Sequence, residues 1–111
     1  MIQTTSTTGQ LPIISTGQAA YYQGFQIVFN WGINANNVIG VDAYWNAYFP
    51  TSGTTINDGV WHSVLVTYDG VTLRIYIDGR LDNAATNWNY GSGSFATTLN
   101  TQGNNIYLGH S

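Results

Sequence analysis

The sequence predicts an all-β protein, an antiparallel β-sandwich of the jelly-roll type, and three observations predict it. Short runs with two-residue alternation and many β-branched or aromatic side chains recur along the 111 residues. Asp-Gly pairs, which favour the tight turns of β-hairpins, lie between several of these runs. No segment of ten or more residues has a clear 3.6-residue apolar period, and the strong helix formers Glu and Lys are absent.

The first predicted elements come from the N-terminal part of the chain. Residues 1–10 are polar and low in complexity, and we expect them to form a flexible or edge segment. FQIVFN (residues 25–30) and VIGVDAYW (residues 38–45) place apolar side chains at alternate positions. Both predict strands with one buried face.

The clearest pattern is a three-stranded antiparallel meander. VWHSVLVTY (residues 60–68) and VTLRIYI (residues 71–77) alternate strictly, and only Asp69-Gly70 separates them. This spacing predicts a two-residue type I′ turn at Asp69-Gly70, because Asp and Gly tolerate positive φ angles. Asp78-Gly79 repeats the device before RLDNAA (residues 80–85).

The rest of the chain predicts a long loop and a closing strand. Residues 86–105 are rich in Gly, Asn and Thr, and residues 105–111, NIYLGHS, read as a strand. We expect one domain over residues 1–111. Its core is predicted to include four aromatic side chains, those of Phe25, Phe29, Trp61 and Tyr68.

The charge content excludes several classes of function. Only 6% of the residues are charged, against about 25% in a typical soluble domain, and the net charge is −3. Two Arg and no Lys cannot neutralise a phosphate track, so nucleic acid is not an expected partner. No apolar run is long enough for a membrane span. The chain has no Cys, which excludes disulfides and thiolate metal sites.

Residues 56–82, INDGVWHSVLVTYDGVTLRIYIDGRLD, carry a resemblance to a known family. The stretch resembles the core of the laminin G-like, concanavalin A-like jelly-roll domains, and weaker similarity extends it to about residues 11–111. The resemblance implies a jelly roll in which His62 packs and forms hydrogen bonds. Members usually have further strands at both ends, so we expect either a truncated chain or sheet edges that neighbouring chains complete, through residues 2–15 and 105–111.

The resemblance raises two kinds of chemistry, glycoside hydrolysis and calcium binding. Glucanases of this fold class typically use paired Glu, and this chain has no Glu, so we expect no catalysis. Some relatives hold Ca²⁺ in loops through Asp and Asn oxygens. The chain offers Asp42, Asp82, Asn83 and Asn87 for such a site, but no spacing matches a calcium loop, and Asx residues also cap turns. We therefore expect no cofactor, with calcium as the open alternative.

The aromatic side chains are the best indication of function. Four of them stand in or near polar, glycine-rich segments: Trp45, Tyr48, Trp88 and Tyr90. A ring beside amides suits sugar recognition, because it packs on the apolar face of a pyranose while the amides bond its hydroxyls. The alternative is that these rings cover the sandwich rim or contact another subunit. The sequence thus predicts a carbohydrate-binding or adhesion module, extracellular or on a cell or virion surface. A self-assembling subunit of a filament, capsid or surface layer is the alternative.

Overall fold

A computed structural model of the chain describes residues 1–16, 25–30, 37–43, 51–69, 72–86 and 106–108. These residues contain strands and connecting segments but no helix. The strands are β1 (Leu11–Thr16), β2 (Phe25–Phe29), β3 (Ile39–Ala43), β4 (Val64–Tyr68), β5 (Thr72–Ile77), β6 (Arg80–Thr86) and β7 (Ile106–Leu108). It follows that nothing in this part of the chain is a helix long and apolar enough to cross a membrane.

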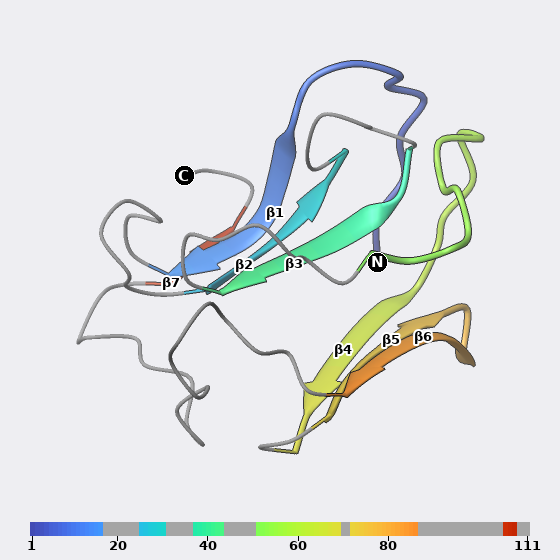
Figure 1. Cartoon of the computed structure of the whole chain (residues 1–111). Helices are drawn as coiled ribbons and strands as arrows, with labels where there is room; N and C mark the ends of the chain where they lie inside the picture. Colours follow the sequence, from blue (N-terminus) through green and yellow to red (C-terminus); the bar gives the residue numbers. More distant parts are fainter. Residues whose placement is uncertain (17–24, 31–36, 44–50, 70–71, 87–105, 109–111) are drawn as a thin grey trace.

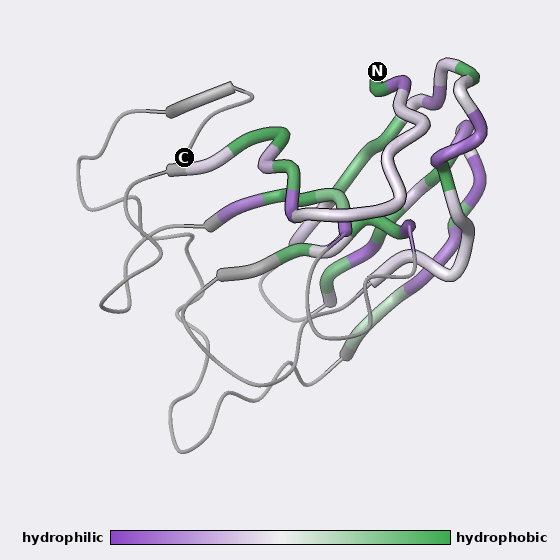
Figure 2. Tube along the Cα trace, turned by 90° about the horizontal axis from the view of Figure 1, so that it is seen from above, coloured by the Kyte–Doolittle hydropathy of each residue, from purple (hydrophilic) through white to green (hydrophobic). Residues whose placement is uncertain are grey.

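The strands form two antiparallel sheets that pack face to face (Figure 1). One sheet has the order β3-β2-β1-β7, and the other is the meander β4-β5-β6. The predicted all-β sandwich is confirmed, and the meander runs in the predicted chain order. Figure 2 shows how apolar and polar positions follow one another along the strands, as two-residue alternation requires.

The core lies between the sheets and draws on both. β2 and β3 contribute Phe29, Ile39 and Val41, while β5 contributes Leu73, Ile75 and Ile77. Ile56, from the segment between β3 and β4, is fully buried among them. Tyr68 packs against this cluster, as predicted. The prediction of one buried face was wrong for β2, since Val28 and Gln26 on its other face are also buried.

The β5–β6 turn has the predicted geometry. Ile77 pairs with Arg80, which leaves Asp78 and Gly79 as a two-residue loop with φ angles of 51° and 76°. Positive φ at both positions defines a type I′ turn, which matches the twist of the flanking strands. The turn thus fixes the register of the β5–β6 hairpin.

Replacing Gly79 with Ala should destabilise the fold through this turn. The added Cβ meets no atom within 4 Å, so the effect comes from the positive φ alone. We expect the free energy of unfolding to fall by roughly 1–2 kcal/mol in urea titration. Gly53→Ala is the matched control, because Gly53 lacks a positive φ and its Cβ would lie an ordinary 3.8 Å from Asp82. Equal losses in both variants would contradict the turn assignment.

The predicted turn between β4 and β5 was wrong in register. Tyr68 pairs with Leu73, whereas a turn made by Asp69-Gly70 would pair Tyr68 with residue 71. Asp69 lacks the positive φ of a type I′ position. Its Oδ1 accepts a hydrogen bond from the Thr72 N–H (2.7 Å), and its own N–H donates to the Thr72 carbonyl (3.3 Å). Asp69 therefore ends the ladder; residues 70–71 lie outside the described residues.

The N-terminal segment runs beside the segment that leads into β4 (Figure 1). Ile2 and His62 exchange both backbone hydrogen bonds, at 2.9 and 2.8 Å. The Gly59 N–H donates to the Thr4 carbonyl (3.0 Å), and the Gln3 side chain donates to the Gly59 carbonyl. Residues 2–4 are thereby tied to the backbone of Gly59 and His62.

Candidate functional site

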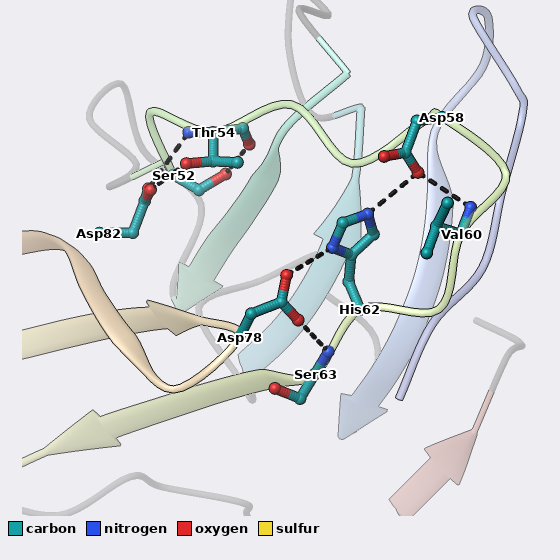
Figure 3. Close-up of polar contacts among 8 residues, drawn as sticks. All are labelled: Ser52, Thr54, Asp58, Val60, His62, Ser63, Asp78 and Asp82. Atoms are coloured by element: carbon teal, nitrogen blue, oxygen red, sulfur yellow. Dashed lines mark hydrogen bonds and ion pairs between the residues drawn. The ribbon is translucent and has the colours of Figure 1, made fainter.

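Two carboxylates that stand before glycines converge on one imidazole (Figure 3). His62 Nδ1 lies 2.7 Å from Asp78 Oδ2, and His62 Nε2 lies 3.0 Å from Asp58 Oδ1. Asp78 belongs to the β5–β6 turn and Asp58 to the turn before β4, so the imidazole joins two separate turns. We call Asp58, His62 and Asp78 the histidine clamp.

Local backbone geometry places each member of the histidine clamp. Asp58 Oδ1 also accepts the Val60 N–H (2.9 Å), which closes the turn over Gly59. Asp78 Oδ1 accepts the Ser63 N–H (2.9 Å), and the Asp78 N–H donates to the Ser63 carbonyl (3.0 Å). The backbone on both sides of His62 is therefore tied to the turns that hold its ring.

The histidine clamp favours a charged imidazole. Hydrogen bonds to Asp78 and then to Asp58 raise the pKa of His62, whose side chain is only 12% exposed. The pKa of Asp78 is lowered by His62 and by the Ser63 N–H, and that of Asp58 by the Val60 N–H and by His62. Both ring nitrogens can donate to carboxylates only when the imidazole carries both protons. With both ring nitrogens engaged, His62 links the two turns, which agrees with the hydrogen-bonding role that the resemblance implied.

Another carboxylate, that of Asp82, ties β6 to the segment after β3 (Figure 3). Asp82 accepts hydrogen bonds from the Gly53 N–H, the Thr54 N–H and the Thr54 hydroxyl. Burial raises the pKa of Asp82, but these hydrogen bonds outweigh it, so the pKa lies below its usual value. The neighbouring Asn83 amide donates to the Thr51 carbonyl (2.6 Å). Asp82 and Asn83 thus hold residues 51–54 against β6.

These contacts bear on the predicted calcium ligands. The carboxylate oxygens of Asp82 accept hydrogen bonds from three protein donors, and the side-chain amide of Asn83 donates one to the Thr51 carbonyl. Asn87 and the side chain of Asp42 lie outside the described residues. Among the residues that can be described, no group of three or more His, Cys, Asp or Glu is placed to hold a metal ion. Asp82 and Asn83 thus act as hydrogen-bonding partners of residues 51–54, and calcium binding stays a prediction.

Trp61 was wrongly predicted to lie in the core. It is 58% exposed, and exposure alternates along the chain from Trp61 through Ser63, Leu65 and Thr67, while His62, Val64 and Val66 between them point inward. The polar Ser63 and Thr67 on the Trp61 face were the sequence signal for this orientation. We call the solvent-facing side of β4-β5-β6, with Trp61 at its end, the outer face.

The four predicted ligand-binding aromatics, Trp45, Tyr48, Trp88 and Tyr90, lie outside the described residues. So do His110 and the side chain of Phe25. The structure brings together instead the histidine clamp and, next to it, the exposed Trp61. Sequence reasoning assigned Asp78 to a turn, and no pattern in the sequence indicated that Asp58 and Asp78 meet at His62.

Comparison with protein families decides the classification of this sandwich. A laminin G family model, described as concanavalin A-like lectin/glucanases superfamily, matches residues 2–111. The chain belongs to this superfamily. Comparison with curated proteins and with solved structures gave no match. The resemblance seen in residues 56–82 is thereby confirmed.

Membership of the concanavalin A-like superfamily indicates only a broad class of function for this chain. The superfamily joins lectins, which bind sugars, and glucanases, which cleave them. It supports at most a carbohydrate-binding or adhesion-type module for this chain. Any choice within that range depends on the side chains described above.

Proposed function

We propose that this protein is a non-catalytic carbohydrate-binding or adhesion module of the concanavalin A-like superfamily, acting outside the cell or on a cell or virion surface. The observation that carries the proposal is the engagement of its carboxylates. The chain has five acidic residues, all Asp. Four of them bond within the fold: Asp58, Asp69, Asp78 and Asp82.

Glycoside hydrolysis needs two carboxyl groups that flank the scissile bond, about 5–5.5 Å apart for retention and farther apart for inversion. Asp58 and Asp78 are close to one another through His62, but that imidazole occupies both of them. Asp69 binds the Arg74 guanidinium (2.7 Å) and the Thr72 N–H. The engaged carboxylates leave only Asp42 for chemistry, and a single carboxylate does not support a glucanase mechanism.

Binding without catalysis matches the composition of the chain. Aromatic residues make up 14% of the sequence, and the predicted ligand-binding rings Trp45, Tyr48, Trp88 and Tyr90 stand among Asn, Ser, Thr and Gly. Rings supply an apolar platform for a pyranose, and amides and hydroxyls bond its hydroxyl groups. The function thus follows from aromatic and neutral polar side chains rather than from charge.

A glycan array tests the proposed function. The wild-type chain should bind a subset of immobilised glycans, and Trp88→Ala or Trp45→Ala should abolish that binding because each removes a stacking surface. Trp88→Phe and Trp45→Phe are the matched controls, since they keep a ring, and should retain measurable binding. A folded wild-type chain that binds no glycan on the array would overturn the proposal.

A further inference from the structure

The outer face presents an apolar row that crosses all three strands of the meander. Leu65 of β4 pairs with Tyr76 of β5, and Tyr76 pairs with Leu81 of β6. Paired residues in antiparallel strands point to the same side of a sheet, so these three side chains stand next to one another. Leu65 is 57% exposed and Leu81 56% exposed, and Tyr76 is partly exposed. The row faces solvent rather than the core.

Trp61, three residues before the start of β4, adds to this apolar surface. Its side chain is 58% exposed, and exposure alternates from Trp61 through Ser63 to Leu65. The hydroxyl residues Ser63 and Thr67 are exposed on the same face. His62, next to Trp61, is held by the histidine clamp, which pre-organises the backbone that carries the ring.

The size of the outer face favours a small or thin ligand over a second copy of the chain. Strands of five to seven residues, three abreast, cover on the order of 300 Å² in outline. A stable protein interface buries about 800 Å² on each partner, well above this outline even when side-chain relief is added. The apolar row runs across three strands, so it matches a chain that lies along it more closely than a compact ligand.

The charge of the outer face indicates a neutral ligand. Arg74 stands beside the apolar row on β5, and its guanidinium bonds the Asp69 carboxylate at 2.7 Å. This pair cancels the charge of the only Arg on β5. Arg80, at the start of β6, pairs with the inward-facing Ile77 and therefore stands on the other side of the sheet from Leu81. An anionic polysaccharide would find no unpaired cation along Leu65, Tyr76 and Leu81, whereas a neutral sugar chain needs only apolar surface and hydroxyl groups.

We propose that the outer face is a second carbohydrate-contact surface, which takes an extended, uncharged polysaccharide chain across β4, β5 and β6, with Trp61 and Tyr76 as the stacking rings. This inference rests on the proposed function, and it adds a site separate in sequence from Trp45, Tyr48, Trp88 and Tyr90. Leu65 and Leu81 supply the apolar contact on either side of Tyr76, and Ser63 and Thr67 supply hydroxyl groups.

Affinity electrophoresis of the full chain tests this proposal, in native gels that contain hydroxyethylcellulose, galactomannan or, as the anionic comparison, heparin. A neutral polysaccharide should retard the wild-type chain. Trp61→Ala should weaken that binding about tenfold, with a similar loss for the double variant Leu65→Ala and Leu81→Ala. Trp61→Phe should recover most of it. Leu11→Ala is the control, because Leu11 is 41% exposed on the opposite sheet and should leave retardation unchanged.

The outcomes separate this proposal from the proposed function. Undiminished retardation in a folded Trp61→Ala chain, together with loss of array binding in Trp88→Ala, would overturn the outer-face site alone. So would retardation by heparin only, or array binding without retardation by either neutral polysaccharide. Sedimentation that shows a dimer dependent on Leu65 and Leu81 would assign the face to self-association instead. A wild-type chain that binds neither array nor gel would overturn both proposals.

Discussion

Replacing Ile75 with Ala is expected to lower the free energy of unfolding by roughly 2–5 kcal/mol. Ile75 is fully buried on the central strand of the meander, where it pairs with Val66 and Asn83. It belongs to the core cluster that joins the two sheets, so the cavity left by the substitution would weaken contacts from both sides. A loss of this size is a large share of the roughly 5–15 kcal/mol that stabilises a typical domain.

Urea titration followed by tryptophan fluorescence measures this effect. The control is Leu65→Ala on the neighbouring strand, because Leu65 is 57% exposed and its truncation opens no cavity. We expect Leu65→Ala to change the free energy of unfolding by no more than about 0.5 kcal/mol. Similar losses of stability in both variants would contradict the placement of Ile75 in the core and of Leu65 on the outer face.

The stability of the protein should fall as the pH rises above about 6.5, because of His62. Asp78 and Asp58 raise the pKa of this imidazole in the folded state, so the folded chain holds the proton more tightly than the unfolded chain. The stabilisation is fully present below the ordinary histidine pKa of about 6.5 and is lost as the pH rises through the higher folded-state pKa. Above that point the neutral ring can donate to only one of the two carboxylates.

The two carboxylates of the histidine clamp determine the lowest pH at which the clamp stabilises the fold. The pKa values of Asp78 and Asp58 are lowered in the folded state, so their stabilisation is present above the ordinary aspartate pKa of about 3.9. It is lost as the pH falls through the lowered values. The clamp should therefore contribute most between about pH 4 and pH 6.5.

Urea titration at a series of pH values from about 4 to 9 tests the histidine clamp. His62→Gln keeps a polar side chain but removes the ionisable group, and it should flatten the loss of stability above about pH 6.5. The chain has two His, so His110→Gln is the matched control and should keep the wild-type profile. A wild-type profile that is flat over this range, or a slope that survives in His62→Gln, would contradict the assignment.

The fold was largely predictable because its signals are local. Alternation in residues 60–68 and 71–77 predicted two strands, and the structure pairs residues 64–68 with residues 73–77. Asp78-Gly79 predicted the β5–β6 turn, because these two residue types accept positive φ more readily than others do. At Asp69 the same rule failed, since its carboxylate bonds the Thr72 N–H and moves the register by two positions on β5. Side-chain hydrogen bonds of this kind compete with a turn rule that considers only the backbone.

The candidate site was less predictable. The sequence indicated Trp45, Tyr48, Trp88 and Tyr90 from their polar neighbours, and these assignments stay predictions. Trp61 was expected in the core because large aromatic residues usually bury most of their surface. The polar residues Ser63 and Thr67, at alternate positions after Trp61, indicated instead that this side faces solvent. In the structure they lie on the same exposed side as Trp61.

The sequence by itself determined the strands, the type I′ turn at Asp78-Gly79 and the superfamily, because side-chain alternation and φ preference act over a few residues. Only the tertiary structure decided that Asp58 and Asp78, 4 and 16 residues from His62, both bond its ring. It also decided that Leu65 and Leu81 lie on either side of Tyr76 on the outer face. Both outcomes depend on how separate turns and sheets pack together, which residue spacing does not specify.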